Sequence, residues 1–148
     1  MTDVAWQLEH TVQADVSATF AWNFWTDVTN WDDTPARFVL EGPFAAGSAG
    51  TTLMPGSDPL AWRIQDVLPG RSATIVIQLD RAILSTTWSF DAISDSRTNL
   101  TQHLVLSGEN AAAYIDQVQA GFGSNLPEGM KKVAAAMARA AAGPTSGD

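Results

Sequence analysis

The most constraining feature of this sequence is a change of hydrophobic period near residue 107. Over residues 36–106, short runs of alternating apolar and polar residues are separated by turn-forming stretches rich in Gly, Pro, Ser and Asp. Such consecutive strands on tight turns indicate an antiparallel meander with one buried face. After Gly108 the apolar residues recur at helical spacing, first at 111, 114, 115, 118 and 122, then at 130, 133, 134, 137 and 141. The sequence therefore predicts a sheet followed by a long helix that Gly121 and Gly123 interrupt.

The N-terminal part adds one strand and one short aromatic helix. Apolar and polar residues alternate from Val4 to Val12, as in a half-buried strand. Ser17 offers an N-cap oxygen to a segment whose apolar residues share one helical face, namely Ala21, Phe24, Trp25 and Val28. The element order predicts an α+β fold, in which the helices gather on one face of a single antiparallel sheet. We expect one domain over residues 1–142 and a flexible tail over 143–148.

Composition excludes several classes of partner and site. Sixteen acidic residues against eight basic ones give a formal charge of −8, which repels phosphate backbones, so we expect no nucleic acid partner. No apolar run reaches the length of a membrane span, and the N-terminus lacks the pattern of a signal peptide, which predicts a cytoplasmic protein without membrane insertion. With no cysteine, and with His10 on the apolar face of its strand and His103 on the opposite parity of its own, we expect no metal site and no cofactor. The sequence leaves a homodimer open.

Several segments together resemble a known superfamily. The stretch AWNFWTDVTNWDD, the later LEGPFAAGSAG, the turn in DVLPGR and the run SRTNLTQHLVLSGENAA resemble the START-like (SRPBCC) superfamily, in particular its polyketide cyclase and dehydrase branch. The resemblance covers nearly the whole chain. It implies a helix-grip fold, in which a curved antiparallel sheet of about seven strands wraps a long C-terminal helix, with short helices after the first strand. It also implies a cavity between sheet and helix.

Seven residues are candidates for contact with a ligand in that cavity. Trp62 and Trp88 lie on the apolar parity of their strands, and Gln102 is a polar residue on a face otherwise made of leucines. A buried amide needs a hydrogen-bonding partner, which a ligand or a neighbouring group can supply. The candidate set is Trp25, Trp31, Trp62, Trp88, Phe90, Gln102 and Tyr114. For the tryptophans the alternative is ordinary core packing, because each large aromatic side chain buries about 150–250 Å².

Three functions remain open on the sequence. The first is binding of a small, largely apolar molecule in the cavity. The second is a polyketide cyclase or dehydrase type of enzyme, which needs an acid or base directed into the cavity, with His10, Arg63 and Asp66 as the side chains to inspect. The third is a protein-interaction module, as in the START-like activators of a heat-shock ATPase, which predicts an exposed apolar patch. No catalytic residue is assigned, and whether segment 109–123 moves as a lid is also open.

Overall fold

The computed structural model describes residues 4–31, 37–56, 58–120 and 126–142, without the side chains of Thr29 and Trp31. Its strands are β1 (Val4–Ala14), β2 (Arg37–Glu41), β3 (Ala49–Leu53), β4 (Leu60–Leu68), β5 (Ser72–Leu79), β6 (Ala82–Ser94) and β7 (Arg97–Ser107). Its helices are α1 (Ala18–Trp25), η1 (Val28–Trp31), η2 (Ala111–Tyr114), α2 (Ile115–Val118) and α3 (Leu126–Ala141), of which η1 and η2 are 3-10 helices. Among these helices none has the length and apolar character that crossing a membrane requires.

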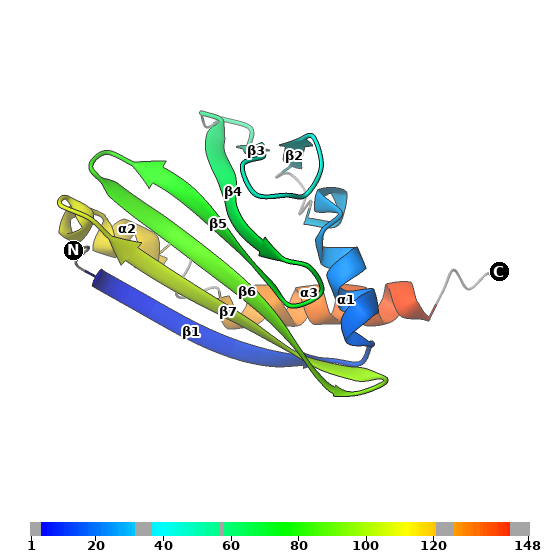
Figure 1. Cartoon of the computed structure of the whole chain (residues 1–148). Helices are drawn as coiled ribbons and strands as arrows, with labels where there is room; N and C mark the ends of the chain where they lie inside the picture. Colours follow the sequence, from blue (N-terminus) through cyan, green and yellow to red (C-terminus); the bar gives the residue numbers. More distant parts are fainter. Residues whose placement is uncertain (1–3, 32–36, 57, 121–125, 143–148) are drawn as a thin grey trace.

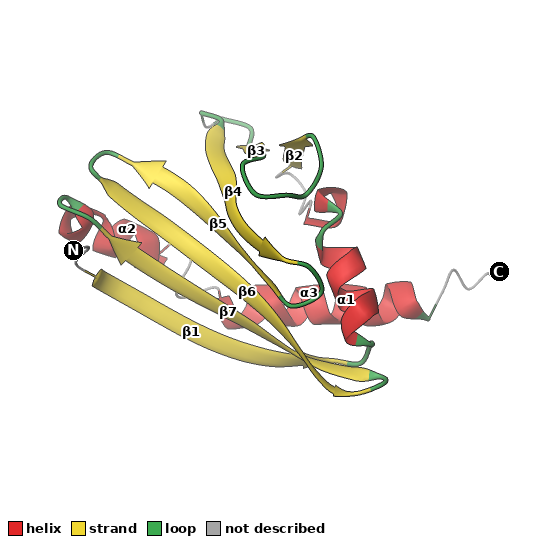
Figure 2. Ribbon diagram, in the orientation of Figure 1, coloured by secondary structure: helices red, strands yellow, loops and turns green. Residues whose placement is uncertain are grey.

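One antiparallel sheet of seven strands forms the frame of the molecule, in the order β1-β7-β6-β5-β4-β3-β2 (Figure 1). The six strands β2 to β7 lie side by side in chain order, while β1 pairs with β7 and so brings the first strand to the end of the meander. The helices lie on one face of the curved sheet, where α3 packs against β1 (Figure 2). The predicted α+β architecture is therefore confirmed, including the short helices after the first strand.

Alternation along β1 and β7 decides which side chains face the helices. In β1, His10 and Val12 are half-buried on the inner face, whereas their neighbours Glu9 and Thr11 are exposed on the outer face. The register continues this pattern across the sheet, because His10 pairs with Gln102, which pairs with Trp88. A continuous row of inner-face residues therefore crosses three strands.

Strand β4 changes phase within its length. The register shifts between Ile64 and Asp66, as a β-bulge does when it inserts one extra residue. Trp62 and Ile64 are buried before the shift, and Val67 returns to the inner side after it, so the bulge explains why their spacing departs from strict alternation.

Two side chains fix the turn that leads from β1 into α1. The Ser17 hydroxyl caps α1 by accepting a hydrogen bond from the Phe20 amide at 3.0 Å. Thr98, which is fully buried in β7, donates from its hydroxyl to the carbonyl oxygen of Val16 at 2.9 Å. These bonds set the direction of α1, and they thereby direct Trp25 at its end toward the core.

The C-terminal region is less regular than the predicted single broken helix. The apolar spacing from Ala111 to Val118 belongs to one turn of 3-10 helix followed by one turn of α-helix, and α3 is the long helix among the described residues of this region. The predicted interruption at Gly121 and Gly123 lies outside the described residues, as does the predicted tail over 143–148.

Candidate ligand-binding cavity

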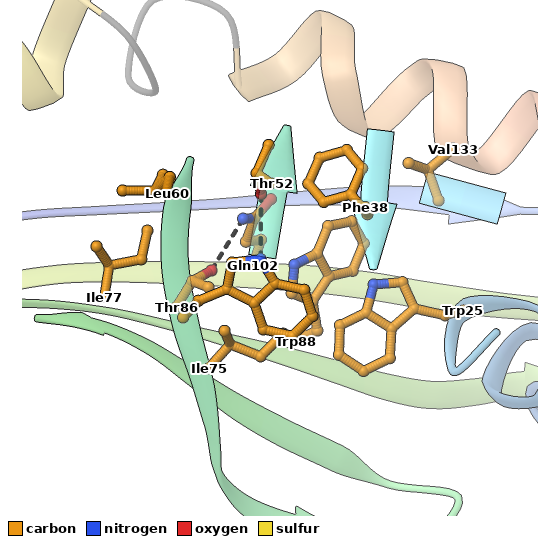
Figure 3. A pocket seen from close by; sticks show the side chains of 11 residues that line it. Trp25, Phe38, Thr52, Leu60, Ile75, Ile77, Thr86, Trp88, Gln102 and Val133 are labelled. Atoms are coloured by element: carbon orange, nitrogen blue, oxygen red, sulfur yellow. Dashed lines mark hydrogen bonds between the residues drawn. The ribbon is translucent and has the colours of Figure 1, made fainter. Parts of the chain in front are cut away.

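A cavity of about 340 Å³ lies between the inner face of the sheet and α3 (Figure 3). This volume is at the lower end of the range of about 300–1,000 Å³ that small-molecule sites occupy. Leu60 is 40% exposed although it lines the cavity, so the cavity opens to solvent beside the start of β4. The lining residues are Trp25, Phe38, Thr52, Leu60, Trp62, Ile75, Ile77, Thr86, Trp88, Gln102 and Val133.

One wall of the cavity is aromatic. Trp25 from α1 and Trp88 from β6 meet with ring centroids 5.5 Å apart and planes inclined by 32°. Behind them Phe44 and Phe90 support Trp25, with ring centroids at 5.2 Å and 5.4 Å from it. Trp25 is only 3% exposed, so it belongs to the core and to the cavity wall at once. Such backing holds the Trp25 indole in a fixed position beside Trp88.

Trp62 forms a second part of the cavity wall, and the position of its ring depends on Gly50. Its six-membered ring lies directly over Gly50 of the neighbouring strand β3, where a Cβ atom would overlap the ring carbons. Gly50 therefore permits a close approach that no other residue allows. The indole Nε1 of Trp62 donates a hydrogen bond to the Thr52 hydroxyl at 3.1 Å, which fixes the orientation of the ring.

Polar atoms are few on this surface. Apart from the tryptophan indoles, the polar side chains in the lining are Thr52, Thr86 and Gln102. Gln102 donates from Nε2 to the Thr86 hydroxyl oxygen at 2.9 Å, across the pair of strands β6 and β7 (Figure 3). The amide thus has a partner within the protein, as a polar group on an apolar face requires.

The described lining contains no acidic, basic or histidine side chain. Arg63 and Asp66 are exposed and lie on the outer face, beside the bulge in β4. His10 lies on the inner face next to Gln102 but is not among the lining residues. Within the described residues no group of three or more acidic, histidine or cysteine side chains could hold a metal ion. The arrangement offers apolar contact and neutral hydrogen bonds.

The structure brings four of the seven predicted site residues together at the cavity: Trp25, Trp62, Trp88 and Gln102. Phe90 is buried behind Trp25 and does not line the cavity. Tyr114 lies elsewhere, because its hydroxyl accepts a hydrogen bond from the Asp80 amide at 3.2 Å, in the turn between β5 and β6. The side chain of Trp31 is outside the described part of the chain.

The segment that carries Tyr114 has further bonds to the same turn. The Asn110 amide donates to the Arg81 carbonyl oxygen at 2.8 Å, and its side-chain Nδ2 donates to the Asp80 carbonyl oxygen at 3.1 Å. Residues 110–114 are therefore attached to the β5–β6 turn through both Asn110 and Tyr114, and neither residue lines the cavity.

Sequence reasoning missed seven lining residues: Phe38, Thr52, Leu60, Ile75, Ile77, Thr86 and Val133. Ile75, Ile77 and Thr86 could have been predicted from the sequence, because each lies on the inner face of a strand with clear alternation. Phe38 and Thr52 belong to strands of five residues, where alternation alone gives a weak signal.

No protein-family model matches the chain, and a search of curated proteins found no match. Solved structures match over almost its whole length. Norcoclaurine synthase from Thalictrum flavum, in complex with dopamine and hydroxybenzaldehyde, is 11% identical with a TM-score of 0.69, over 99% of this chain and 90% of that one. A protein from Thermobifida fusca is 12% identical with a TM-score of 0.71, over 90% of this chain and 93% of that one. Ara h 8.0201 is 12% identical with a TM-score of 0.67, over 92% of this chain and 96% of that one.

The chain has the helix-grip fold. The agreement in topology with these structures confirms the fold that the resemblance to the START-like superfamily implied. At 11–12% identity the likeness concerns the fold. In a helix-grip fold, the apolar space between sheet and α3 is a feature of the architecture, and the side chains described above give it its particular chemistry.

Proposed function

We propose that this protein binds a small, largely apolar molecule in the cavity between the sheet and α3. The observation that carries the proposal is the chemistry of the lining, which is aromatic and aliphatic apart from three neutral polar side chains. Apolar burial supplies the affinity in such a site, and a few polar groups orient the ligand.

The enzyme alternative needs a proton donor or acceptor at the cavity surface. The outer-face positions of Arg63 and Asp66 count against it, and so does the absence of His10 from the lining. The interaction-module alternative rests on an exposed apolar patch. Trp25, Trp62 and Trp88 are buried, and the exposed large apolar side chains of the described residues are aliphatic residues and one methionine, such as Val39, Leu53 and Met54. Binding is therefore the function that this geometry supports best. A cytoplasmic location and a homodimer stay predictions from the sequence.

Titration with N-phenyl-1-naphthylamine tests the proposal, because the emission of this neutral dye rises in apolar surroundings. Ile77 lines the cavity, and its neighbour Val76 faces the outer side of the same strand. We expect saturable binding by the native chain and by Val76→Phe, and much weaker binding by Ile77→Phe, in which the added ring occupies the cavity. Equal binding by Ile77→Phe and the native chain would place the dye elsewhere and overturn the proposal.

A further inference from the structure

The cavity lining has no formal charge among the described residues, and this restricts the ligand. A carboxylate or ammonium group moved from water into such a surface loses its hydration and finds no counter-ion. A ligand of this site therefore has to be neutral in the part that enters the cavity. The protein as a whole is strongly acidic, with a formal charge of −8, which disfavours anionic ligands further.

Thr86 and Gln102 form a hydrogen-bonded pair, and each side chain can make further hydrogen bonds. The Thr86 oxygen accepts one bond from Gln102 Nε2 at 2.9 Å, but its own hydroxyl hydrogen has no acceptor among the described residues. Within the same part of the chain, the Gln102 Oε1 atom has no donor. Both side chains line the cavity, and a threonine hydroxyl or a glutamine amide can donate and accept at the same time. The pair thus presents the Thr86 hydroxyl hydrogen as a donor and Gln102 Oε1 as an acceptor, beside the second hydrogen of Gln102 Nε2.

A ligand hydroxyl group complements that pair. It can accept from the Thr86 hydroxyl and donate to Gln102 Oε1, so that both of these groups are paired on binding. An ether or ketone oxygen can only accept, so Gln102 Oε1 would stay without a donor. Sites built around buried hydrogen-bonding groups reject ligands that fail to pair with them.

We propose that the cavity selects an uncharged aromatic molecule with a hydroxyl group, a phenol or naphthol, whose ring packs against Trp25 and Trp88 and whose hydroxyl bonds Thr86 and Gln102. This inference rests on the proposed binding function and specifies its ligand class. The aromatic character follows from the two indoles, whose ring centroids lie 5.5 Å apart and of which Trp25 packs against Phe90.

The test compares three naphthalenes by isothermal titration calorimetry at neutral pH: 2-naphthol, 2-methoxynaphthalene and 2-naphthoate. The protein variants are Thr86→Val, Gln102→Met and, as a matched control, Thr87→Val. Thr87 is the next residue of β6, but it lies on the outer face, where its hydroxyl bonds Thr74 at 2.8 Å. Its substitution makes the same chemical change away from the cavity.

We expect the native chain to bind 2-naphthol more tightly than 2-methoxynaphthalene, and 2-naphthoate most weakly. Thr86→Val and Gln102→Met should each weaken 2-naphthol binding by about 3- to 10-fold, the worth of one hydrogen bond, and change 2-methoxynaphthalene binding less. Thr87→Val should bind all three as the native chain does.

The outcomes separate the two proposals. If 2-naphthol and 2-methoxynaphthalene bind equally to the native chain and to both cavity variants, the ligand class is wrong while the binding function stands. Binding of 2-naphthoate as tight as that of 2-naphthol would also overturn the ligand class. If none of the three binds, both proposals are overturned.

Discussion

Replacing Gly50 with alanine should destabilise the protein through a single contact. Gly50 is buried in β3, and a Cβ atom there would overlap the Trp62 ring carbons Cη2, Cζ2 and Cζ3. Because these atoms belong to a rigid indole on the neighbouring strand, the ring has to move. A moved ring loses its 3.1 Å hydrogen bond to Thr52 or enters the cavity.

The expected loss of stability can be estimated from the displacement of the Trp62 ring and the loss of its hydrogen bond to Thr52. Forcing an extra methyl group into a packed position costs about 1–3 kcal/mol. Loss of the indole hydrogen bond adds about 0.5–1.5 kcal/mol. Together these terms amount to about 1.5–4.5 kcal/mol. For a chain of this length, each kcal/mol of unfolding free energy corresponds to about 2–4 °C in Tm, so we expect Gly50→Ala to lower Tm by about 3–18 °C. Affinity for N-phenyl-1-naphthylamine should fall as well, because Trp62 lines the cavity.

Differential scanning calorimetry of Gly50→Ala beside Gly129→Ala measures this effect. Gly129 lies in α3, is exposed, and has open space where a Cβ would stand. Alanine in a helix is favoured over glycine by about 0.5–1 kcal/mol, so the control should raise Tm. The two substitutions are chemically identical and should act in opposite directions. A Gly50→Ala protein with the native Tm and native dye affinity would refute the contact between Gly50 and Trp62.

Three further substitutions test other parts of the account. Thr98→Val leaves the buried Val16 carbonyl oxygen without its side-chain donor and should lower the free energy of unfolding by about 1–3 kcal/mol in urea denaturation; no change would contradict the role given to this bond. Ser17→Ala removes the cap of α1 and should cost about 1 kcal/mol, whereas Ser17→Asp, measured in the same way, should retain most of the stability. Tyr114→Phe should leave dye affinity unchanged, because Tyr114 lies outside the cavity lining; a marked loss of affinity would contradict that placement.

Much of the fold could be predicted because local patterns and the global arrangement agree. Strict alternation in β5, β6 and β7 identifies their inner faces, and the same parity places Trp88 and Gln102 at the cavity. The first helix was recognisable from Ser17 and the apolar spacing that follows it.

The remaining differences have physical causes that a single sequence does not display. The bulge in β4 shifts the phase after Ile64, so the outward direction of Asp66 could not be read from alternation. Tyr114 ends a 3-10 helix, where residue spacing differs from that of an α-helix, and this directs its hydroxyl to the β5–β6 turn. Thr52 meets Trp62 only because β3 and β4 pair in one particular register.

The most direct test of ligand binding in the cavity is a series of two-dimensional ¹H–¹⁵N NMR spectra recorded during titration with N-phenyl-1-naphthylamine. Aromatic rings shift the resonances of nearby nuclei, so the tryptophan indole signals report where the dye lies. We predict that the signals of Trp25, Trp62 and Trp88 move and saturate together, while that of Trp6, which is not a lining residue, stays in place. Saturating shifts at Trp6 without shifts at the three cavity tryptophans would contradict the account.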